Sequence, residues 1–130
     1  MPVELGMRGR AAAVAAEEDT ARALGSGTVP VLATPRMIAL MEQAAVNAVQ
    51  SELLPGQTTV GTRLDVTHDA ATPIGMRVWA EAELTAAEGR KLVFAVAAYD
   101  ETGKIGGGTH ERFIIQTDKF LARAQEKWKR

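Results

Sequence analysis

One long helix followed only by strands is the pattern that most constrains this chain. Residues 35–51 contain good helix formers and no breaker, between the pair Thr34-Pro35 and the turn pair Pro55-Gly56. Extended segments follow, expected at residues 59–68, 76–84, 91–99 and 104–116. Because helices do not alternate with these strands, a doubly wound parallel sheet is not expected. We predict an α+β fold in which an antiparallel sheet packs against one apolar helix.

The two ends of the chain carry weaker signals. Residues 7–16 are alanine-rich and predict a short first strand, and residues 17–24 predict a helical turn that begins with acidic residues. Thr117-Asp118 begins a C-terminal helix with an apolar stripe and a basic tail. A chain of 130 residues can bury a core of its own, so we expect a single domain over residues 1–130.

The amino-acid composition excludes several classes of function. The chain has no cysteine, which excludes disulfides, thiolate metal sites and a cysteine nucleophile. Fifteen basic residues balance sixteen acidic ones, so a nucleic-acid partner is not expected. Neither a long apolar run nor a signal-peptide pattern is present, so we expect no membrane association and a cytoplasmic location. Any imidazole chemistry depends on His68 or His110.

Glu42 stands where a charged side chain is not expected. On a helical wheel it falls with the apolar stripe, between Ile38 and Val46 at four-residue spacing. A carboxylate in that position needs polar partners. Two interpretations stay open: a residue at the margin of the stripe or in a buried ion pair, and a residue that serves a functional site.

His68 and Thr34 allow two interpretations each. His68 shares a strand face with Leu64 and Val66, as either a buried histidine bonded to a carbonyl or a functional base. Thr34 is predicted as the N-cap of the helix, a role worth about 1 kcal/mol, but a helix N-terminus also attracts negative charge. Thr34 and Glu42 are eight residues apart, so both can line one cleft without touching.

The second polar cluster of the sequence surrounds a run of glycines. Residues 106–108 are all glycine, but they lack the lysine and following helix of a phosphate-binding loop, so a bulge or a close backbone approach is expected there. The following polar run, residues 109–112, is interpreted as a solvated strand edge. A metal site of His68, His110 and Glu42 is not expected, because no local ligand spacing supports it.

Three segments together resemble the hot-dog-fold acyl-CoA thioesterases, and among these the fluoroacetyl-CoA thioesterases. The first is residues 33–44 (ATPRMIALMEQA), which resembles their central helix. The second is Gly61-Thr62 with residues 66–76 (VTHDAATPIGM), which resembles the strand and turn after it. The third is residues 106–112 (GGGTHER), which resembles their last strand. The segments keep the order of the family and span most of the chain.

The resemblance implies a hot-dog fold, in which a curved antiparallel sheet wraps around the central helix. It implies hydrolysis of an acyl-CoA thioester without a separate cofactor, in a homodimer or a dimer of dimers with active sites at the dimer interface. By resemblance, Thr34, Glu42 and His68 match the catalytic group of the family. Gly61 matches the glycine near the reacting carbonyl, and Arg112 matches a supporting arginine.

Residues 22–32 depart from that family, because the aromatic-rich lid expected there has no aromatic residue in this chain. The departure favours a more open acyl site or a different small acyl group. The alternative is a non-catalytic module that binds acyl-CoA or another acyl ligand, and a dehydratase of the same fold ranks below it. The residues leave open whether Thr34 attacks the thioester or positions a water molecule. They also leave open whether Glu42 orients His68 or activates water, and whether Arg112 supports Glu42 or contacts a CoA phosphate.

Overall fold

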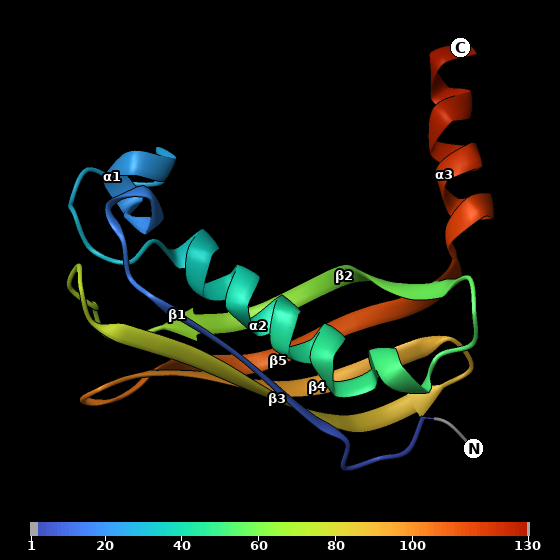
Figure 1. Cartoon of the computed structure of the whole chain (residues 1–130), viewed down its shortest axis with the longest axis horizontal. Helices are drawn as coiled ribbons and strands as arrows, with labels where there is room; N and C mark the ends of the chain where they lie inside the picture. Colours follow the sequence, from blue (N-terminus) through green and yellow to red (C-terminus); the bar gives the residue numbers. More distant parts are fainter. Residues whose placement is uncertain (1–2, 130) are drawn as a thin grey trace.

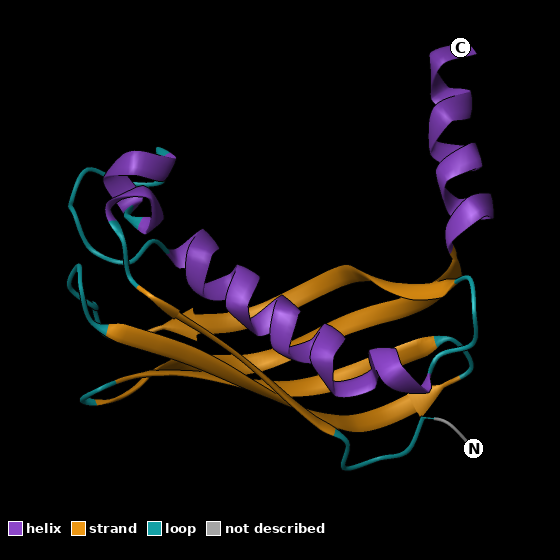
Figure 2. Ribbon diagram, in the orientation of Figure 1, coloured by secondary structure: helices purple, strands orange, loops and turns teal. Residues whose placement is uncertain are grey.

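A computed structural model describes residues 3–129 of the chain. Five antiparallel strands form one sheet in the order β1-β3-β4-β5-β2 (Figure 2). Their bounds are β1 Arg8–Val14, β2 Gln57–His68, β3 Arg77–Glu88, β4 Lys91–Asp100 and β5 Gly103–Gln116. The long helix α2, Thr34–Val49, lies across one face of the sheet and continues into the short 3-10 helix η2, Gln50–Glu52 (Figure 1). The predicted α+β architecture is confirmed.

The terminal elements also follow the expectation. Strand β1 occupies the predicted alanine-rich segment, and the acidic turn forms the 3-10 helix η1, Glu17–Asp19, followed by helix α1, Ala21–Leu24. The C-terminal helix α3, Thr117–Gln125, continues into η3, Glu126–Lys129. Among residues 3–129, no helix combines the length and the apolar character needed to cross a bilayer.

Small side chains bring the sheet and α2 into close contact. The apolar face of α2 is buried against the sheet through Met37, Leu40, Met41, Ala44, Ala45, Ala48 and Val49. Gly9 of β1 lies against this face, where an added Cβ would collide with the backbone of Ala44 and Ala48. Protein interiors are close-packed, so a side chain at this position would push β1 and α2 apart, and only glycine fits. The alanine-rich composition thus lets the sheet curve around the helix (Figure 1).

The glycine run at residues 106–108 serves strand pairing, as predicted. A Cβ at Gly106 would collide with the carbonyl of Thr67, and one at Gly108 with the carbonyl of Asp65, both on β2. Gly108 also has a φ of 153°, which side chains rarely adopt. The run therefore permits the close approach of β5 to β2.

Strand β2 ends the sheet on one side. It pairs with β5, and in the described part of the chain no strand pairs with its other edge. Helix α3 follows β5 directly, and Gln116 at the end of β5 pairs with Gln57 at the start of β2, so α3 begins on the paired side of β2. Figure 1 shows α3 standing away from the sheet. Three apolar side chains of this C-terminal segment are exposed, namely Phe120 and Leu121 of α3 and Trp128 of η3, the last to 86%.

Candidate active site

Thr34 and His68 meet where the N-terminus of α2 approaches the end of β2. The hydroxyl Oγ1 of Thr34 lies 2.7 Å from Nδ1 of His68. The prediction of Thr34 as N-cap is wrong, because Ala33 occupies that position and Thr34 is the first residue of the helix. Being one residue further along, Thr34 directs its hydroxyl to the imidazole of a neighbouring strand rather than to its own helix.

The surroundings of His68 suit a neutral base. The side chain is half-buried, and burial lowers its pKa below the ordinary value, against the weaker opposing effects of the Ala70 backbone and of the Asp69 charge. Its Nε2 atom is buried and has no hydrogen-bond partner among the described residues. The ring therefore bonds Thr34 through Nδ1, and a neutral ring that accepts there carries its hydrogen on Nε2.

A cavity of about 320 Å³ opens at this pair. It lies between the segment that follows α1 and the residues after β2. Its lining is Ala21, Ser26, Gly27, Val29, Val31, Leu32, Thr34, His68, Asp69, Ala70 and Ala71. This lining contains no Phe, Tyr or Trp side chain.

Glu42 belongs to a second group of residues further along α2. Its Oε2 lies 3.8 Å from Nη1 of Arg112, and its side chain is 39% exposed. A Cβ on Gly61 would lie 2.8 Å from Oε2 of Glu42 and 3.2 Å from Nη1 of Arg112. Glu42 is thus at the margin of the apolar stripe, in an ion pair, and Gly61 leaves the room that this pair occupies.

Arg112 is fixed by several contacts within the sheet. Its Nε donates to Oγ1 of Thr59 at 2.8 Å, and its Nη2 donates to the carbonyl of Thr59 at 2.9 Å. Burial lowers the pKa of Arg112, and the carboxylate of Glu42 opposes that effect. Since the guanidinium is only 6% exposed and already faces Glu42, the structure favours support of Glu42 over contact with a CoA phosphate.

The prediction that residues 109–112 form a solvated strand edge is wrong for two of them. His110 is 0% exposed and Arg112 is 6% exposed, because alternate residues of β5 face α2. Nδ1 of His110 lies 2.8 Å from the carbonyl oxygen of Arg63, and its Nε2 lies 3.2 Å from Nη1 of Arg112. The carbonyl-bonded histidine considered for His68 is therefore His110. The two-residue spacing from Arg112 was the available signal.

The two groups do not meet within one chain. Thr34 and Glu42 are separated by about 12 Å of rise along α2, and His68 and Gly61 by about 23 Å along β2. Glu42, Gly61 and Arg112 do not line the cavity at Thr34 and His68. The structure thus presents two partial sites, one with a hydroxyl and an imidazole, the other with a carboxylate beside a glycine.

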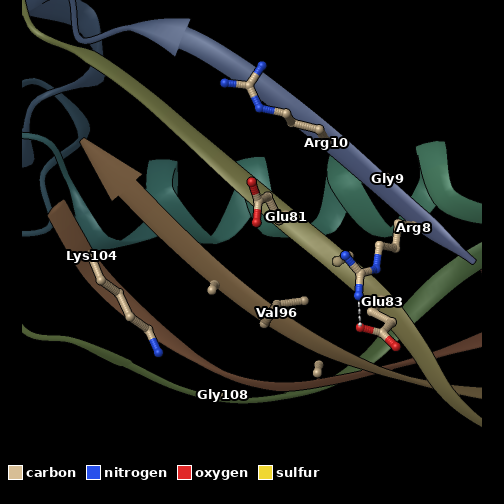
Figure 3. A pocket seen from close by; sticks show the side chains of 11 residues that line it. Arg8, Gly9, Arg10, Glu81, Glu83, Val96, Lys104 and Gly108 are labelled. Carbon is tan, nitrogen blue, oxygen red and sulfur yellow. Dashed lines mark ion pairs between the residues drawn. The ribbon is translucent and has the colours of Figure 1, made fainter. Parts of the chain in front are cut away.

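A larger cavity of about 670 Å³ contains none of the predicted site residues. It lies over the sheet strands, with charged side chains of Arg8, Arg10, Glu81, Glu83 and Lys104 around small residues (Figure 3). Arg8 and Glu83 form an ion pair at 3.2 Å. Over residues 3–129, no group of three His, Asp or Glu side chains is arranged to hold a metal ion.

Comparison with known proteins gives consistent matches. Residues 15–118 match the model of a family described as fluoroacetyl-CoA-specific thioesterase. The chain is 47% identical over 97 residues to the fluoroacetyl-CoA thioesterase of Streptantibioticus cattleyicolor, covering 75% of this chain and 70% of that one.

Solved structures agree with these matches. A fluoroacetyl-CoA thioesterase superposes with a TM-score of 0.91 at 40% identity, covering 96% of this chain and 97% of that one. A thioesterase superfamily member from Thermus thermophilus superposes with a TM-score of 0.88 at 32% identity, covering 98% and 97%.

Proposed function

The chain belongs to the family of fluoroacetyl-CoA-specific thioesterases, and on that basis we propose that it hydrolyses a small acyl-CoA to a carboxylic acid and free CoA. The observation that carries the proposal is the 2.7 Å contact between Oγ1 of Thr34 and Nδ1 of His68 at the mouth of a cavity. A hydroxyl bonded to a neutral imidazole is the pairing that acyl transfer requires. No separate cofactor takes part, since CoA belongs to the substrate.

The first chemical step uses this pair. His68 accepts the proton of Thr34 while the hydroxyl oxygen attacks the thioester carbonyl, which gives an acyl ester on Thr34 and releases CoA as its thiol. Backbone N–H groups at the N-terminus of α2 and near Gly61 are the candidate donors to the oxyanion. Water then hydrolyses the ester, with Glu42 as the group that activates it, and restores the Thr34 hydroxyl.

Glu42 reaches this reaction in a homodimer. Two copies that pair antiparallel through their β2 edges, about an axis near the middle of residues 61–68, set His68 of one copy opposite Gly61 of the partner subunit. The Thr34–His68 pair then faces the carboxylate group of the other copy. Support comes from the edge of β2 that no described strand pairs with, and from the exposed apolar residues of the C-terminal helical segment. A dimer is the smallest assembly that this arrangement needs, and a dimer of dimers remains a prediction.

The acyl group is proposed to be small and need not carry fluorine. The lining of the 320 Å³ cavity has no aromatic side chain, so it lacks the shaped wall expected of a fluoroacetyl-selective lid. Because CoA thioesters are intracellular metabolites, the proposed location is the cytoplasm.

A panel of acyl-CoA substrates tests the function. Acetyl-, propionyl-, butyryl- and fluoroacetyl-CoA are incubated with the wild type and with Glu42→Ala, and released CoA is trapped through its thiol. We expect steady turnover of at least one substrate by the wild type and a large loss in the variant. Binding of every substrate without thiol release would indicate the non-catalytic module instead.

Rapid mixing followed by mass spectrometry of the intact chain tests the covalent step. An acyl adduct that maps to Thr34 is expected before steady turnover. An active enzyme that never shows the adduct would indicate direct attack by water, with Thr34 positioning it.

A further inference from the structure

We propose that His110 is a positioning residue, whose Nε2 accepts a hydrogen bond from Arg112 and so holds the guanidinium against Glu42. The proposal rests on the proposed function, in which the Glu42 carboxylate takes part in thioester hydrolysis. His110 is fully buried, so it acts through Arg112 rather than on the substrate.

The contacts of His110 define where its proton lies. Nδ1 is 2.8 Å from the carbonyl oxygen of Arg63, which can only accept, so Nδ1 carries the hydrogen. Nε2 of a neutral ring is then an acceptor, and it lies 3.2 Å from Nη1 of Arg112, which can only donate. The two neighbours thus select a single neutral tautomer.

The charged groups around the ring are consistent with its neutrality. Burial is the main effect that lowers the pKa of His110, and the cation of Arg112 lowers it further. The bond to Arg63, Glu42 on α2 and Glu111 on β5 act in the opposite direction. A protonated ring would set a second donor and a second cation against Arg112.

The remaining contacts of Arg112 show how its hydrogen bond to His110 affects Glu42. Nε and Nη2 of Arg112 are held by Thr59, which leaves Nη1 as the nitrogen that faces both His110 and Glu42. His110 therefore completes the set of acceptors that fixes Nη1, and Nη1 lies 3.8 Å from the carboxylate. A small displacement of a catalytic group is enough to slow a reaction on the order of 10²-fold.

Two amide substitutions separate this role from simple packing. His110→Gln can place an oxygen near the position of Nε2 and keep an acceptor for Arg112. His110→Asn can place an N–H near the position of Nδ1 and keep the bond to Arg63, but it removes that acceptor. We expect kcat to fall on the order of 10²-fold in His110→Asn with little change in KM, and to be largely kept in His110→Gln. The midpoint of urea unfolding measures stability in both variants.

Equal kcat in the two variants, or losses that follow their stability, would overturn the proposal. A second measurement does not depend on turnover. A long-range ¹⁵N–¹H correlation spectrum of the wild-type protein should show the His110 proton on Nδ1 and none on Nε2. A proton on Nε2 would overturn the positioning role, whereas a wild type with the expected tautomer but no thioesterase activity would contradict only the proposed function.

Discussion

His68 is the residue at which protonation should decide the reaction rate. As the proposed base for the Thr34 proton, it must be neutral, and burial holds its pKa below the ordinary value of 6.5. The neutral form therefore persists to lower pH than in an exposed histidine. We expect kcat/KM to fall on the acid side with a midpoint below 6.5, measured as a pH profile with a small acyl-CoA.

Two variants identify the ionisable side chain whose pKa sets the midpoint of this pH profile. His68→Ala should lower kcat/KM on the order of 10²- to 10⁴-fold. His110→Gln removes the other histidine and should keep the acid limb. A profile that loses this limb in His110→Gln, or an unchanged kcat/KM in His68→Ala, would contradict the assignment.

Gly61 is the residue whose lack of a side chain leaves room for the carboxylate. A Cβ there would lie 2.8 Å from Oε2 of Glu42, closer than real Cβ contacts. We expect Gly61→Ala to displace Glu42 and lower kcat on the order of 10²-fold, while the urea midpoint changes little because β2 is exposed here. A normal kcat in a folded Gly61→Ala would show that Glu42 has no fixed position in the reaction.

The residues that sequence reasoning found and missed differ in a physical way. Glu42 and His68 were recognisable because each is polar on an apolar face of its own element. His110 and Arg112 stand in a run of four polar residues, and nothing local tells which of them α2 will cover. A register shift between Gly61 and Arg63 also realigns β2 with β5, and such a bulge depends on strand pairing rather than on local sequence.

At the scale of elements, periodicity made most of the fold predictable. Helix α2 and strands β3 to β5 were within a few residues of the expected bounds, because one buried face gives each a clear pattern. The orientation of α3 was not predictable. Its apolar stripe indicated a packing face, but no element of the described chain covers that face.

Helix α3 should therefore contribute to self-association. Replacing Phe120, Leu121 and Trp128 by serine removes apolar area that we expect to be buried between subunits. Each large side chain contributes about 1.5–3 kcal/mol when buried, so the dimer dissociation constant should rise about tenfold or more per side chain. Sedimentation velocity over a concentration series measures it.

A matched control uses the opposite side of the same helix. Lys119→Ser with Glu126→Ser removes one charge of each sign and leaves the apolar stripe intact. This variant should sediment like the wild type. Equal dissociation constants for the wild type and the triple serine variant would exclude α3 from the interface.

At the scale of the whole molecule, the separation of the two partial sites leads to a prediction about dimers that mix two variants. His68→Ala and Glu42→Gln each disable a different half, so in a mixed dimer one composite site is intact and the other carries both changes. After unfolding and refolding an equimolar mixture, random pairing should restore about a quarter of wild-type activity. Thiol release measured before and after mixing tests this.

The same mixture also tests the alternative in which each site is built within one chain. In that case the mixture is no more active than its two inactive components. Mixing two preparations of His68→Ala, one of them tagged, gives the control for refolding itself. The resemblance named the candidate site residues, and the structure adds that Glu42, Gly61 and Arg112 lie outside the cavity lined by Thr34 and His68.

If two copies complete each site by pairing along the β2 edge, as proposed, catalysis depends on the protein concentration. A monomer then holds both groups of residues and completes neither site. Well below the dissociation constant, the amount of dimer grows with the square of the protein concentration. Specific activity should then fall on dilution although every chain remains folded, and a modest change in expression would alter the fraction of enzyme that works as well as its amount.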